Sequence, residues 1–145
     1  MIPFKDFTKQ NHSHEISNII DNFVNFACQN LNIKTYPQIV LVKGTSLAKE
    51  RMSFGGYIAG IGRIEITIAN RHIMDILRTL AHEIVHYKQD LDGVLRDDSG
   101  NDGSEHENEA NSKAAVIMRM WGKSNPDMFE KAVIIAEQWN KGKLS

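Results

Sequence analysis

The chain has 145 residues, which predicts a single domain over 1–145. Its 41% hydrophobic and 24% charged residues are typical of globular proteins and exclude a disordered chain. The formal net charge of -1 provides no basic field, so we expect no nucleic-acid partner. No apolar run approaches the roughly 20 residues that span a bilayer, so we expect no membrane partner either. Because Cys28 is the only cysteine and no secretory signal is visible, the cytoplasm is the expected compartment.

The first half of the chain predicts one helix and a small sheet. Residues 1–12 are expected to form a loose N-terminal arm, and Ser13 suits the N-cap of a helix whose apolar residues recur at helical spacing up to Ala27. Residues 39–42 form a short β-branched run that is typical of a buried strand.

Two further strands, at residues 53–60 and 63–69, complete this predicted sheet. The second alternates apolar and polar side chains, as a strand with one covered face does. The intervening Gly60-Ile61-Gly62 suits a hairpin turn.

Three helices are predicted to follow the strands. Asn70 is the expected N-cap of a long helix ending near Leu91, with an apolar face made by Ile73, Ile76, Leu77, Leu80 and Ile84. Another helix is expected from about 104 to 121, and Asn125-Pro126-Asp127 opens a last one. Because strands and helices are segregated along the chain, the pattern predicts an α+β fold.

The most informative motif is His82-Glu83-Ile84-Val85-His86. Two histidines four positions apart lie one turn above one another on the same helix face, so both imidazoles can bind one cation. Glu83 projects to the side of the ion, where a carboxylate can take a proton from metal-activated water. The motif predicts a metal site with His82 and His86 as ligands and Glu83 as the catalytic base.

A catalytic zinc ion usually has three protein ligands and one open position. A third histidine in a His-x-x-Gly-x-x-His pattern does not occur, because Gln89 and Asp92 stand where glycine and histidine are needed. The alternative is a side chain from the helix near 104–115, which offers Glu105, His106, Glu107 and Glu109.

The segment Glu107-Asn108-Glu109-Ala110-Asn111 resembles the Glu-x-x-Ala-Asp/Asn signature of the gluzincin metallopeptidases. The resemblance implies that Glu107 is the third metal ligand and that Asn111 supports an imidazole through its amide oxygen. Residues 53–122 are also similar to small zincin-like proteins encoded by tailed phages. This implies a minimal zincin-like domain: an N-terminal helix, a three-stranded, mostly antiparallel sheet, an active-site helix, a Glu helix and a C-terminal helix.

The function implied by this resemblance is zinc-dependent hydrolysis of peptide bonds, with Glu83 activating a zinc-bound water and a peptide or protein as substrate. The compartment would be the host cytoplasm if the chain is phage-encoded. The strand at 63–69 is the expected place for an extended substrate to pair by β-addition. Imidazole and carboxylate ligands also accept manganese and cobalt. The oxyanion-stabilising residue stays open among Tyr57, Tyr87, His106 and Arg119.

Several alternatives stay open at this point. Glu109 or His106 could replace Glu107 as the third ligand. The chain could be a catalytically silent zincin-fold protein that binds metal in a regulatory role, since its length leaves little room for substrate subsites. A weaker alternative is a calcium-binding EF-hand-like loop over 98–109, which departs from that pattern at Gly100 and Glu105. The sequence does not predict an oligomeric state.

Overall fold

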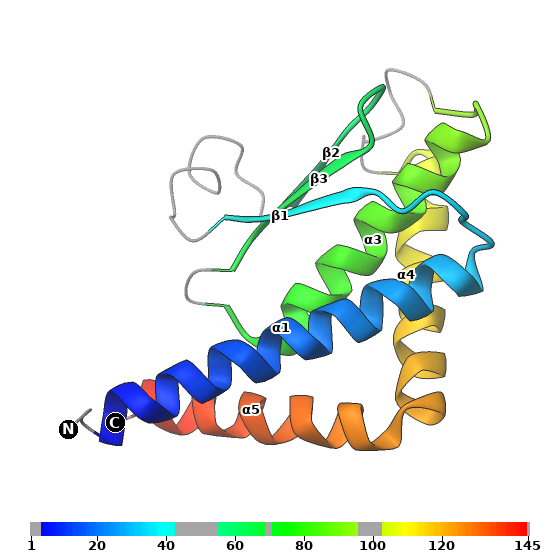
Figure 1. The fold of residues 1–145 in the computed structure, drawn as a ribbon. Helices are drawn as coiled ribbons and strands as arrows, with labels where there is room; N and C mark the ends of the chain where they lie inside the picture. The colour runs from blue at the N-terminus through cyan, green and yellow to red at the C-terminus, as the bar shows by residue number, and fades with distance from the viewer. Residues whose placement is uncertain (1–3, 43–54, 69–70, 96–102, 145) are drawn as a thin grey trace.

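The computed structural model describes residues 4–42, 55–68, 71–95 and 103–144 (Figure 1). Within these ranges, four helices and a three-stranded sheet form an α+β fold, as predicted. Their bounds are α1 (Phe4–Asn30), β1 (Gln38–Val42), β2 (Gly55–Ile58), β3 (Arg63–Thr67), α3 (Ile73–Leu91), α4 (Glu105–Ser124) and α5 (Pro126–Leu144).

The sheet has the strand order β1-β3-β2, so β3 is the central strand. The predicted hairpin is confirmed: β2 and β3 pair antiparallel, and Gly60 and Gly62 in the turn have φ values of 87° and 63°, which favour glycine. In contrast, β1 and β3 run parallel, because the chain crosses over between them, so only one of the two ladders is antiparallel.

The central position of β3 corrects the prediction that this strand receives an added peptide. The backbone groups of β3 pair with β1 on one side and with β2 on the other. A further strand can therefore pair only at an outer edge of the described sheet, which is β1 or β2. Of these two edge strands, β2 packs against α3.

The N-terminal helix corrects the prediction of a loose arm over residues 1–12. α1 begins at Phe4, so Ser13 lies inside the helix and is not its N-cap. No proline or glycine occurs between Phe4 and Asn30, and nothing in this stretch forces a helix to start late. Residues 1–3 lie outside the described ranges.

α3 lies between the sheet and the other helices (Figure 1). Its N-cap is His72, whose Nδ1 accepts a hydrogen bond from the Met74 backbone N–H at 3.1 Å, while the predicted cap, Asn70, lies outside the described residues. All five predicted apolar positions of this helix are buried: Ile73, Ile76, Leu77, Leu80 and Ile84. The helix is thus fixed by apolar packing along one face.

The core continues into α1 and the two C-terminal helices. Trp121 of α4 is fully buried, contacts Phe23 edge to face and donates from Nε1 to Oδ1 of Asn22 at 2.8 Å. The loop before α4 ends at Ser104, whose hydroxyl caps this helix. Among the described residues, no helix is both long and apolar enough to cross a membrane.

Candidate metal centre

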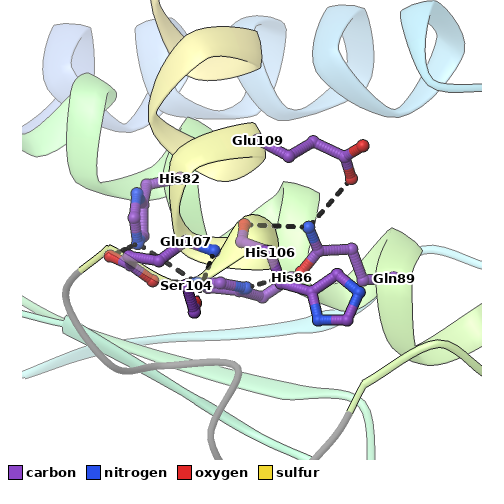
Figure 2. A network of polar contacts seen from close by, with 7 residues as sticks. All are labelled: His82, His86, Gln89, Ser104, His106, Glu107 and Glu109. Carbon is purple, nitrogen blue, oxygen red and sulfur yellow. Dashed lines mark hydrogen bonds and ion pairs between the residues drawn. The ribbon is translucent and has the colours of Figure 1, made fainter.

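The two motif histidines come together on one face of α3, as their spacing predicts (Figure 2). The Nε2 atoms of His82 and His86 are 3.2 Å apart, and the rings meet edge to face with centroids 4.7 Å apart. Because four residues make slightly more than one helical turn, both imidazoles extend in the same direction.

The third predicted ligand arrives from the first turn of α4. The Ser104 hydroxyl accepts a hydrogen bond from the Glu107 backbone N–H at 3.1 Å, which fixes the start of this helix. Glu107 Oε1 lies 2.9 Å from Nε2 of His82, and Oε2 lies 2.9 Å from Nε2 of His86. One ligand atom from each of these residues lies within 4.8 Å of the others, a grouping that can hold a metal ion.

The two hydrogen-bond contacts of His86 require one more proton than a neutral imidazole carries. Its Nδ1 lies 2.8 Å from Oε1 of Gln89 and its Nε2 lies 2.9 Å from a carboxylate oxygen of Glu107. Both neighbours are hydrogen-bond acceptors, but a neutral imidazole has one N–H. The second contact therefore needs either an extra proton or a cation.

A metal ion resolves this shortage because it accepts lone pairs from all three side chains. Ligands of a tetrahedral zinc ion, with bonds of about 2.0–2.1 Å, lie about 3.3 Å from one another. The Nε2 atoms of His82 and His86 are 3.2 Å apart, and each lies 2.9 Å from a different carboxylate oxygen of Glu107. Two imidazoles and one carboxylate therefore fit zinc, and by the same ligand chemistry manganese or cobalt.

Each of the two imidazoles has a hydrogen bond with an amide side chain. Gln89 lies against His86, and a side-chain hydrogen bond links His82 to Asn111, the residue that the gluzincin resemblance assigns to this role. Burial lowers the pKa of His82 below 6.5, together with repulsion from His86, while Glu107 and Asn111 act in the opposite direction. Burial of His82 thus favours the neutral imidazole, the form that binds metal.

Glu83 is adjacent to the ligands and nearly buried, with 8% of its surface exposed. Burial raises the pKa of its carboxyl from 4.5 to about 7, the charge of Glu107 acts in the same direction, and His86 opposes it. Among the described residues, no hydrogen bond to this carboxylate is present. A carboxyl group with a pKa near neutrality can both accept and return a proton.

The rival third ligands are directed elsewhere. Glu109 Oε1 accepts a hydrogen bond from Gln89 at 2.9 Å, and its other oxygen pairs with Lys113 at 3.7 Å. His106 provides its backbone carbonyl to the same glutamine, and its ring is not one of the three grouped donors. The EF-hand alternative gains no support either, because Glu109, its twelfth residue, is engaged in these contacts; residues 98–102 lie outside the described ranges.

Three of the four candidate oxyanion donors have other partners or lie far from the ligand cluster. The Tyr57 hydroxyl hydrogen-bonds to Asp90, and the Tyr87 hydroxyl donates to the Thr35 carbonyl at 2.6 Å. Arg119 is exposed on α4, twelve residues beyond Glu107, or about 18 Å along the helix.

The sequence did not predict a role for Gln89. In the sequence analysis this residue is named only because it stands where the His-x-x-Gly-x-x-His pattern needs glycine. The signal that could have found it is its spacing: Gln89 follows His86 by three positions and so lies on the same face of α3.

Comparisons with protein-family models, curated proteins and solved structures found no match to this chain.

Proposed function

We propose that this protein is a zinc-dependent metallopeptidase of the gluzincin type, in which His82, His86 and Glu107 hold the metal and Glu83 is the general base. The observation that carries the proposal is the convergence of three lone-pair donors from two helices with too few protons to satisfy them. A buried site of this kind is favourable when a cation occupies its centre.

Each side chain then has a defined task. The neutral imidazoles and the Glu107 carboxylate hold the ion, which when bound acts as a Lewis acid on water and on the peptide carbonyl. Glu83 takes the proton of the attacking water on its carboxylate and returns it to the departing amine. The burial that raises its pKa to about 7 suits this double role near neutral pH.

The substrate proposed is an extended peptide or protein segment that pairs with β2. This strand packs against α3: a Cβ added at Gly55 would lie 2.6 Å from Cγ2 of Thr79, one turn before His82. A peptide added beyond β2 would therefore run alongside the helix that carries the histidines. In this proposal β2, and not the central strand β3, is the strand that pairs with the substrate.

We also propose that the chain is a small zincin-like protein of the kind that tailed phages encode. Such a protein would act in the host cytoplasm. The thiol of Cys28 is consistent with a reducing compartment: it is buried and unpaired, and burial raises its pKa to about 11. This side chain packs in the core and takes no part in the proposed chemistry.

A catalytically silent metal-binding protein is the second candidate, favoured by one observation. The hydroxyls of Tyr57 and Tyr87 are engaged by Asp90 and Thr35, so neither is available to stabilise an oxyanion. A regulatory protein could use the same His82–His86–Glu107 cluster without this group.

The test uses Glu83→Gln, with Glu105→Gln as a matched control on the exposed surface of α4. Zinc-loaded proteins are incubated with a peptide library, cleavage is read by mass spectrometry, and bound zinc is measured by elemental analysis. We expect Glu83→Gln to keep its zinc and lose about 10²–10⁴-fold in cleavage rate, while Glu105→Gln matches the wild type.

Two results would contradict the proposal in different ways. A wild-type protein that binds one zinc ion but cleaves no library peptide supports the silent alternative. A wild-type protein that binds no zinc at micromolar concentration removes the metal centre itself.

A further inference from the structure

Gln89 is a buried residue beside the ligands that the proposed mechanism does not use. It follows His86 by one helical turn, is only 2% exposed, and its Oε1 lies 2.8 Å from Nδ1 of His86. A buried amide needs partners for both its carbonyl oxygen and its amino group, so the positions of its neighbours decide which way it points.

The neighbours of Gln89 fix the orientation of its amide. Its other end lies 3.0 Å from the His106 carbonyl oxygen and 2.9 Å from Oε1 of Glu109. Both are acceptors, so only the amino group can occupy that end. The carbonyl oxygen must then face His86, and Nδ1 of His86 must be the donor. The remaining nitrogen, Nε2, presents its lone pair toward Glu107.

Gln89 also joins the two helices that make the site (Figure 2). It belongs to α3, while His106 and Glu109 stand on either side of Glu107 in α4. One amide thus contacts the imidazole of the second ligand and the backbone next to the third. The same two helices carry His86 and Glu107, whose side chains are 2.9 Å apart.

From these contacts we propose that Gln89 is a positioning residue of the metal centre. It holds His86 in the tautomer with the proton on Nδ1 and ties α4 to α3, so that Glu107 meets the two imidazoles. The inference rests on the proposed metal site, but its first part concerns the metal-free protein. Loss of such supporting contacts typically costs about 10–100-fold in metal affinity.

The test compares two substitutions of Gln89 with a control. Gln89→Met keeps the length of the side chain and removes both hydrogen-bonding ends. Gln89→Glu keeps an acceptor for His86 but removes the donor to the His106 carbonyl and places a second carboxylate near Glu109. Lys113→Gln breaks only the exposed ion pair at the outer end of this network, whose nitrogen–oxygen distance is 3.7 Å.

The first measurement is the tautomer of His86, read from imidazole ¹⁵N chemical shifts of the metal-free protein. We expect Nδ1 to carry a proton in the wild type, in Gln89→Glu and in Lys113→Gln, and a mixture of Nδ1–H and Nε2–H forms in Gln89→Met. A wild-type ring protonated on Nε2 alone, or an unchanged protonation pattern in Gln89→Met, would overturn the first part of the proposal.

The second measurement is zinc affinity by competition with a chelator, after circular dichroism has shown which variants are folded. We expect both Gln89 variants to bind zinc about 10–100-fold more weakly and Lys113→Gln to stay within twofold of the wild type. Wild-type affinity in Gln89→Glu would refute the helix-joining role. If the wild type itself binds no zinc, the proposed function fails, whereas the tautomer measurement still decides the role of Gln89.

Discussion

Removing the buried charge of Glu83 should stabilise the metal-free protein at neutral and alkaline pH. The side chain is 8% exposed, and burial is the main reason that its pKa rises from 4.5 to about 7 in the folded state. The folded protein therefore binds this proton more tightly than the unfolded chain does. Glutamine has nearly the same shape but never ionises, so Glu83→Gln avoids the cost of burying a carboxylate.

The sign and size of the effect follow from proton linkage. Because the folded pKa is raised, the contribution of this carboxyl to stability is fully present below pH 4.5, is lost as the pH rises to about 7, and then levels off. A pKa change of this size corresponds to a free-energy difference on the order of 3 kcal/mol. We expect Glu83→Gln to be more stable than the wild type by about 2–3 kcal/mol at pH 8 and nearly equal to it at pH 4.5.

The assay is urea unfolding of both metal-free proteins at pH 4.5 and pH 8, followed by circular dichroism. Groups that titrate in both proteins, such as His82, largely cancel in the comparison. Glu105→Gln, on the exposed surface of α4, is the control for the loss of one carboxylate. A stability gain in Glu83→Gln that is the same at both pH values would refute the assignment of the cost to the buried carboxylate.

Three further predictions concern metal binding and packing. Zinc at 100 times its dissociation constant should stabilise the wild type by about 2.7 kcal/mol, and calorimetry should show no such gain in His82→Ala, which lacks one ligand. Gly55→Ala should cost about 1–3 kcal/mol in urea unfolding, because its Cβ would lie 2.6 Å from Thr79 Cγ2; an unchanged midpoint would contradict this packing. Trp121→Phe should lose about 2 kcal/mol, because it removes the hydrogen bond to Asn22 and leaves space in the core; equal denaturation curves would argue against that contact.

The sequence predicts best where a structural feature depends on nearby residues. The face of α3 that becomes core and the pairing of His82 with His86 both follow from spacing within one helix. The hairpin follows from Gly60 and Gly62, whose positive φ values the turn requires. The convergence of Glu107 with the histidines depends on how α3 meets α4, so it was reached only through a family resemblance.

Features that depend on contacts between distant segments could not be predicted in this way. The alternation in β3 indicates a covered face but does not reveal that the strand is paired along both edges. Gln89 reads as an ordinary polar residue until His106 and Glu109 arrive from another helix. Ser13 is a residue type that is common at helix N-caps, but it lies inside α1, which begins at Phe4. The helix continues on both sides of Ser13 because no neighbouring residue breaks it.

The division of α3 into two faces explains how the chain can maintain an electrostatically costly site. Leu77, Leu80 and Ile84 are fully buried on one face, and burial of each is worth about 1.5–3 kcal/mol. Together they outweigh the ionisation cost of Glu83, which is on the order of 3 kcal/mol. Apolar packing along this face therefore contributes to holding the helix independently of its polar face. If the proposed metal site is correct, His82 and His86 are thus oriented before any ion binds, and binding energy would hold the metal rather than order the chain.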